Sequence, residues 1–261
     1  APNPIEDLFP APQGNFIAKA SSNASFDILG KLNREHLQSR EGDSRLNARI
    51  QSYELAARMQ LAAPEAMDIS KEPAYIRKLY GLDHNVQTFD KEINAIEEID
   101  HFSRKCLVAR RLLERGVRFV QIYCGAENTT AKKIRPNWDS HEDIVRDHGY
   151  WGPILDTGAA ALLTDLKSRG LLESTLVICT TEFGRQPGAQ GGGGKGRDHN
   201  PGAFTAWMAG GGIKGGTAYG ATDDLGFKAV LDPTYCYDLH ATALHLLGLD
   251  HEKLSFYHNG I

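Results

Sequence analysis

Residues 175–201, TLVICTTEFGRQPGAQGGGGKGRDHNP, decide the predicted fold. They begin with a short apolar run, residues 176–179, which is typical of a strand buried on both faces, as in a parallel sheet. The run ends abruptly in polar residues, and a glycine-rich loop with charged ends follows. Open α/β sheets bind their ligands beyond the carboxyl ends of the strands. We therefore expect this loop to form the floor of an active site.

The composition of the chain is that of an ordinary globular protein. It has 261 residues, of which 41% are hydrophobic and 24% charged, and its formal net charge is −4. Without a basic stripe, no nucleic-acid partner is expected. No apolar run approaches the roughly 20 residues of a membrane helix, so no membrane span is expected. The four cysteines include no C-x-x-C pair. Cys106, Cys124 and Cys179 lie in apolar segments and are interpreted as buried free thiols, with one disulfide as the open alternative.

The order of the predicted elements indicates an α/β fold. Strands are expected at residues 117–124, 176–179 and 204–209, with a crossover helix over 152–170 and a last helix over 239–247. We predict three α/β/α layers with a mostly parallel sheet and a helical N-terminal segment. Three or four strands make a thin parallel sheet. The prediction is therefore that N-terminal strands are missing and that the chain is the C-terminal portion of a longer protein.

Two parts of the chain are distinguished by their local patterns. Residues 1–43 are rich in proline near the start and are predicted to form an irregular arm or linker, with a short helix over 26–36. Residues 44–261 are predicted to be the C-terminal part of one α/β domain. Within it, residues 44–116 show helical periodicity, and residues 117–261 carry the sheet and the site loops.

Histidine and carboxylate side chains recur in loops beside successive predicted strands, on one expected edge of the sheet. The predicted metal ligands are Asp139, His141, Glu182, Asp198 and His199. Mixed imidazole and carboxylate ligands suit zinc or manganese better than calcium or magnesium, so we expect one of the former as cofactor. The alternative for each residue taken singly is a turn role. Asp139 would then form an Asx-turn, and Asp198 with His199 would cap the turn into Pro201.

Three cations flank the glycines and are predicted to bind the oxygens of an anionic substrate: Arg185, Lys195 and Arg197. The alternative is a flexible surface loop with solvated charges. The loop matches G-x-G-x-x-G through its low complexity alone, and it neither directly follows a strand nor opens a helix, so a dinucleotide site is not expected. No G-x-S-x-G elbow is present, and the sequence identifies no catalytic nucleophile.

Several motifs together are similar to the bacterial domain-of-unknown-function 1501 family. The motifs are WDSH at 138–141, TEFGR at 181–185, GRDHNP at 196–201, AGGGIKGG at 209–216 and YDLHATALHLLGLDHEKL at 237–254. The similarity extends through SYELAARMQ at 52–60, CLVARRLLERGVRFVQIY at 106–123 and LLTDLKSRGLLESTLVI at 162–178. This family is placed in the alkaline phosphatase/sulfatase-like superfamily.

The resemblance implies an exported, periplasmic or extracellular hydrolase of sulfate or phosphate esters, acting on a small molecule or a glycan. It also implies that the nucleophile comes from a more N-terminal part of the protein, so the 261-residue chain alone is expected to be inactive. Phe183 stands where the superfamily usually has a metal-binding histidine, which argues against a full two-metal site. The alternative is a non-catalytic exported protein that retains the fold and binds anions or glycans.

Overall fold

The computed structural model describes residues 19–40, 42–83, 95–125, 138–189 and 194–255. The chain divides into two compact units, residues 1–72 and residues 73–261. The described residues combine helices with short, two-stranded antiparallel sheets. All of the predicted site residues belong to the second unit.

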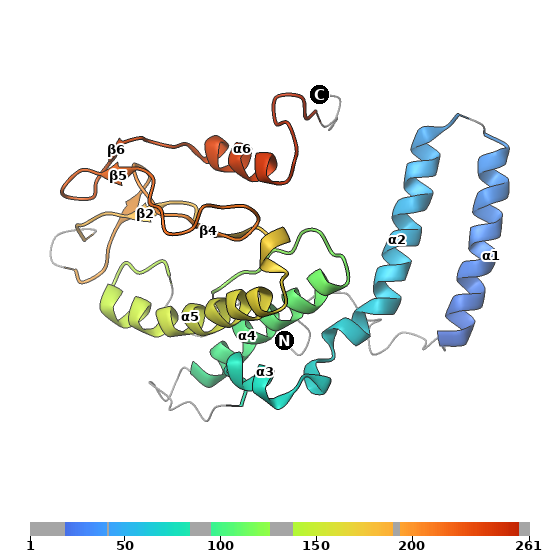
Figure 1. The fold of residues 1–261 in the computed structure, drawn as a ribbon, viewed down its shortest axis with the longest axis horizontal. Coiled ribbons are helices and arrows are strands. Elements are labelled where there is room, and N and C mark those ends of the chain that lie inside the picture. The colour runs from blue at the N-terminus through green and yellow to red at the C-terminus, as the bar shows by residue number, and fades with distance from the viewer. Residues whose placement is uncertain (1–18, 41, 84–94, 126–137, 190–193, 256–261) are drawn as a thin grey trace. The chain divides into compact units, whose positions relative to one another are not determined.

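The first unit contains a pair of helices, α1 (Lys19–Gln38) and α2 (Ser44–Met67), followed by the short 3₁₀ helix η1 (Ile69–Lys71) (Figure 1). The sequence predicts an irregular arm with a short helix over 26–36 in this region. Helix α1 extends beyond that predicted helix at both ends. At the start of α2, Asp43 is the N-cap, and its carboxylate accepts a hydrogen bond of 2.9 Å from the Leu46 amide.

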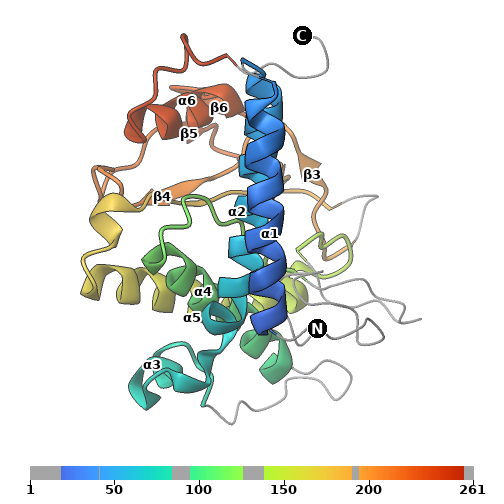
Figure 2. The same ribbon diagram turned by 90° about the vertical axis from the view of Figure 1, so that its right-hand side faces the viewer.

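Two long helices form the core of the second unit. Helix α4 (Ala95–Glu114) lies against α5 (Ile144–Ser168), as Figures 1 and 2 both show. The buried face of the pair includes Leu107 and Leu166, whose side chains are 0% exposed. Within residues 44–116, which the sequence predicts to be helical, residues 84–94 lie outside the described part of the chain. Helix α5 begins earlier than predicted, because the Asp143 carboxylate caps it and Pro153 is accommodated inside it.

A buried ion network connects this helix pair to the short helix α3 (Ala74–Leu79). Asp165 is 1% exposed and accepts hydrogen bonds from Arg169 Nε at 2.6 Å and from Tyr80 Oη at 3.2 Å. Arg110, 2% exposed, lies with its Nε 2.9 Å from the same carboxylate. Several donors thus compensate one buried negative charge, which is the condition under which a buried ion pair is tolerated.

The strands correct the predicted sheet. Strand β1 (Val177–Cys179) pairs with β4 (Trp207–Ala209), but the pair is antiparallel, so the parallel prediction is wrong for it. The reason is the connection: parallel neighbours need a crossover, usually a helix, and the described residues between these strands contain no helix. Residues 117–124, predicted as a strand, pair with no strand of the described chain.

The remaining elements carry the C-terminal part of the chain. Strand β2 (Gly184–Arg185) pairs with β3 (His199–Asn200), and β5 (Ala221–Thr222) pairs with β6 (Ala229–Leu231). A second 3₁₀ helix, η2 (Leu172–Ser174), follows α5, and α6 (Cys236–Leu246) corresponds to the predicted last helix with a shifted start. None of the helices in the described ranges is long and apolar enough to cross a membrane.

The four cysteines are free thiols in the structure. Cys106, on α4, is buried, Cys124 and Cys179 are partly buried, and Cys236 is exposed. Burial raises the pKa of the Cys106 thiol to about 12 and that of Cys124 to about 11. Both therefore stay protonated near neutral pH, where a thiol is a poor nucleophile and a poor metal ligand.

The Asp165 network predicts a large effect on stability. The substitution Asp165→Ala removes the fully buried carboxylate partner of Arg110 and leaves it the partly exposed Glu114, at 2.7 Å. The same change takes away the acceptor of Arg169 and Tyr80, so the free energy of unfolding should fall by about 3 kcal/mol. Urea denaturation followed by circular dichroism measures the change. Asp156→Ala, at an exposed position of the same helix, is the matched control and should change stability by less than about 0.5 kcal/mol. Equal effects of the two substitutions would show that the network does not stabilise the core.

Candidate metal centre

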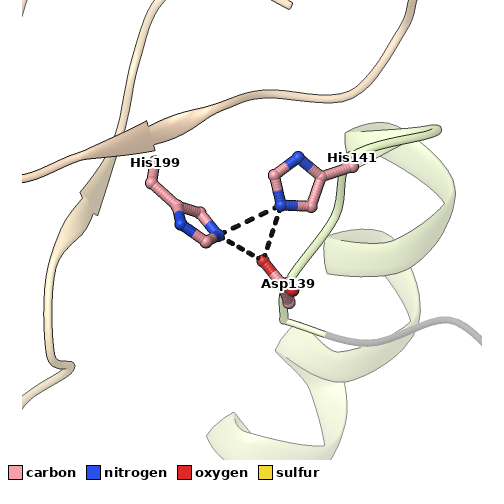
Figure 3. Close-up of side chains that lie close together, drawn as sticks. All are labelled: Asp139, His141 and His199. Carbon is pink, nitrogen blue, oxygen red and sulfur yellow. Dashed lines mark hydrogen bonds and ion pairs between the residues drawn. The ribbon is translucent and has the colours of Figure 1, made fainter. Parts of the chain in front are cut away.

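The first part of the site is the short loop that leads into α5. Ser140 is 0% exposed, and its hydroxyl donates a hydrogen bond of 2.7 Å to the buried carboxylate of Asp147 on the first turns of α5. The Trp138 carbonyl lies 3.2 Å from His148 Nε2 on the same helix. Ser140 is thus anchored in the protein interior, while its neighbours Asp139 and His141 turn toward the site (Figure 3).

The second part of the site is the β2–β3 pair. The antiparallel register places Arg185 directly opposite His199. Gly184, which pairs with Asn200, also lies close to the chain that follows β3. A Cβ atom on Gly184 would lie 2.1 Å from the Ala203 carbonyl oxygen, so this approach requires glycine. The Asp198 carboxylate accepts a hydrogen bond of 2.8 Å from the His199 amide, so it supports the backbone that carries the imidazole.

Main-chain hydrogen bonds join the two parts. The Arg197 amide donates to the Ser140 carbonyl at 2.9 Å, and the Ile144 amide donates to the Lys195 carbonyl at 3.2 Å. Between these bonds the chain passes so close that a Cβ atom on Gly196 would lie 2.0 Å from the His141 carbonyl carbon. Glycine is therefore required at position 196 for this approach. The contact brings residues 139–141 next to residue 199.

Three side chains converge where the two parts meet (Figure 3). Asp139 Oδ1 lies 2.8 Å from His199 Nε2 and 3.0 Å from His141 Nε2, and the two Nε2 atoms are 3.0 Å apart. Donor atoms bound tetrahedrally at about 2.0–2.1 Å from one zinc ion lie roughly 3.3 Å from one another. The three atoms therefore already have nearly the spacing of three ligands around a single small ion.

Asp139 is the electrostatic centre of the cluster. Its Oδ1 atom also accepts a hydrogen bond of 2.6 Å from Arg185 Nη2. Partial burial raises the pKa of the Asp139 carboxyl, but the hydrogen bonds from His199 and Arg185 outweigh this effect and lower it to about 2. The carboxylate is consequently ionised at neutral pH, as a metal ligand must be.

An aromatic side chain borders the cluster on the His199 side. The Phe183 ring packs against the His199 imidazole, with centroids 4.2 Å apart and an interplanar angle of 34°. The Arg185 guanidinium carbon lies 5.9 Å from the centroid of the same ring, within the range of a cation–π contact. Phe183 thereby limits the orientations open to both His199 and Arg185.

The remaining predicted site residues lie outside this cluster. Glu182 is exposed, and Asp198 is used by the backbone of His199, so neither belongs to the group of three convergent ligands found among the described residues. Arg197 donates its guanidinium hydrogens to the carbonyls of Lys195 and Gly196 at 3.3 and 2.8 Å, and Lys195 is exposed. Of the three predicted anion-binding cations, Arg185 is the one that contacts the cluster.

Three residues that shape the site were not singled out from the sequence: Ser140, Asp147 and Gly196. A usable signal existed for Ser140, since a small polar residue between two candidate ligands, Asp139 and His141, leaves both free to face one side. Asp147 acts through Ser140, seven positions earlier, but the direction of its side chain depends on where helix α5 begins. Gly196 acts through its approach to His141, far away in sequence, which no local pattern reveals.

Fold and site together define a mixed helix-and-strand protein with a candidate metal centre of two histidines and one aspartate. The chain belongs to the family described as "Protein of unknown function (DUF1501)", whose model matches residues 8–261. The family resemblance of the sequence motifs is thereby confirmed. Neither the curated proteins nor the solved structures contain a match to this chain.

The lowered pKa of Asp139 predicts a pH dependence of stability. A carboxyl whose pKa falls on folding, here from 3.8 to about 2, stabilises the fold above the higher value, and its contribution is lost as the pH falls toward the lower one. In the presence of a chelator, wild type should therefore be more stable than Asp139→Asn at pH 5, and the difference should vanish as the pH approaches 2.

Thermal or urea unfolding across this pH range measures that difference, with Asp156→Asn as the control for an exposed carboxyl of the same unit. A difference that vanishes between pH 7 and pH 5 would contradict the assignment, because Asp139 would then not be the group whose ionisation is responsible.

Proposed function

We propose that the chain binds one divalent metal ion through Asp139, His141 and His199 and that the centre serves the hydrolysis of phosphate or sulfate esters. The observation that supports the proposal is the convergence of three ligand atoms that all lie within 4.8 Å of one another. Two imidazole nitrogens and one carboxylate oxygen are ligands typical of zinc or manganese, whereas calcium prefers oxygen alone.

A single ion is the better fit to the residues present. Within the described ranges, no second group of three potential ligands was found. Phe183 packs against the His199 imidazole, and its ring has no donor atom that could bind a second ion. We therefore propose one ion rather than the two that the resemblance to the alkaline phosphatase/sulfatase-like superfamily would imply.

Arg185 supports the choice of an oxyanion substrate. Its guanidinium is held beside the cluster by the pairing of β2 with β3 and is within 2.6 Å of Asp139. A guanidinium presents two parallel N–H donors, which match two oxygens of a phosphate or sulfate group. A divalent ion at this site would polarise the ester and lower the pKa of an attacking nucleophile.

The residue that would act as a nucleophile is not assigned. The hydroxyls of Ser140, Thr180 and Thr181 are hydrogen-bonded to Asp147 Oδ2, the Thr181 carbonyl and the Phe183 carbonyl, respectively. This observation favours a second candidate function, in which the protein binds an anionic ligand, such as a sulfated or phosphorylated glycan, at the metal and Arg185 without cleaving it.

Metal binding is tested by substitution of one ligand at a time. His199→Ala and Asp139→Ala should each weaken zinc binding by about 100-fold or more, because each removes one of three ligands. Competition with a chromophoric chelator measures the affinity. Glu182→Ala removes a nearby carboxylate outside the cluster and should leave the affinity within about twofold of wild type. Loss of zinc on Glu182→Ala, with retention on His199→Ala, would exclude the proposed ligand set.

Catalysis is tested with p-nitrophenyl phosphate and p-nitrophenyl sulfate on the natively expressed protein. The hydrolase proposal predicts turnover that requires zinc or manganese, disappears in His199→Ala and persists in Glu182→Ala. Metal-dependent binding of these esters without release of nitrophenol would instead support the second candidate function.

A further inference from the structure

Arg185 and the proposed metal ion would compete for one atom. Asp139 Oδ1 lies 2.6 Å from Arg185 Nη2, 2.8 Å from His199 Nε2 and 3.0 Å from His141 Nε2. The guanidinium therefore contacts the same oxygen that faces both imidazoles. An ion held by the three side chains would need this oxygen, and its positive charge would repel the guanidinium.

Among the described residues, Asp139 is the carboxylate that forms an ion pair with Arg185. The second contact of Arg185 is a hydrogen bond of 3.3 Å from Nη1 to the Arg197 carbonyl, and its side chain is 17% exposed. The Phe183 ring lies 5.9 Å away and restricts the guanidinium to the vicinity of the cluster. A displaced Arg185 would thus stay near the ion with two free N–H donors.

We propose that Arg185 couples metal binding to oxyanion binding: it neutralises Asp139 in the metal-free protein, and the ion releases it to bind a tetrahedral oxyanion beside the metal. This inference rests on the proposed metal centre. The ion and the guanidinium together carry three positive charges against the single charge of Asp139, so an anion that lies between them relieves their repulsion. The released guanidinium fork fits two oxygens of a sulfate or phosphate group.

The coupling predicts two effects of removing the Arg185 charge, one on metal binding and one on oxyanion binding. Removal of the Arg185 charge should strengthen metal binding, because the ion no longer displaces an ion pair or faces a neighbouring cation. The same change should abolish the effect of metal on oxyanion binding. By linkage, the factor by which zinc raises the affinity for sulfate equals the factor by which sulfate raises the affinity for zinc.

The first experiment measures zinc affinity by chelator competition in a buffer free of oxyanions. Arg185→Met should bind zinc about tenfold more tightly than wild type. Arg185→Lys retains the charge and should stay within about threefold of wild type, which distinguishes charge from a change of packing around Phe183. Arg118→Met, which removes an exposed arginine that shares no hydrogen bond with the cluster, should have no effect.

The second experiment titrates inorganic sulfate into each protein with and without zinc, by calorimetry. Wild type and Arg118→Met should bind sulfate at least tenfold more tightly with zinc, and Arg185→Met should lose this dependence. Zinc affinity that is unchanged or weaker in folded Arg185→Met, or sulfate affinity in wild type that is independent of zinc, overturns the coupling while leaving the metal centre intact. Absence of zinc binding by wild type overturns both proposals.

Discussion

A main-chain contact at Gly196 is the constraint on which the candidate metal centre depends. His141 and His199 are 58 positions apart in sequence and are brought together by main-chain contacts. Two amide hydrogen bonds, from Arg197 to Ser140 and from Ile144 to Lys195, place the loops at a separation that leaves no room for a Cβ atom on residue 196. The ligand spacing is therefore set by backbone geometry, which is more rigid than any pairing of exposed side chains.

The helical core extends this rigidity to the site. Helix α5 packs against α4 through buried apolar residues and the Asp165 network, and its first turns carry the buried Asp147 that holds Ser140. Preorganised ligands of this kind lose little conformational entropy when an ion binds. The loop that carries His199 has weaker support, since β2 and β3 each comprise two residues. Any adjustment on ion binding is thus expected on the side of His199 and Arg185.

The sequence predicted what depends on local patterns. The helices follow apolar periodicity and caps, and their existence is confirmed. Helix α5 begins earlier than the sequence predicts, because Asp143 caps it and Pro153 lies inside it. The parallel sheet is predicted from three apolar runs, at 117–124, 176–179 and 204–209. The β1–β4 pair is antiparallel, because the described residues between its strands contain no crossover helix. Among the ligands, Asp139, His141 and His199 converge, whereas Glu182 and Asp198, adjacent in sequence to site residues, do not. Neighbouring positions in a loop do not determine side-chain direction, and the contact at Gly196 depends on residues more than 50 positions apart.

The proposed centre binds one ion through two imidazoles and a carboxylate. X-ray absorption spectroscopy of the zinc-loaded protein tests it most directly, because it reports the atoms around the metal. We expect one equivalent of zinc with two imidazole ligands at about 2.0–2.1 Å and oxygen in the remaining positions. Sulfur scattering at about 2.3 Å, which would implicate the cysteines, or zinc without imidazole ligands would contradict it.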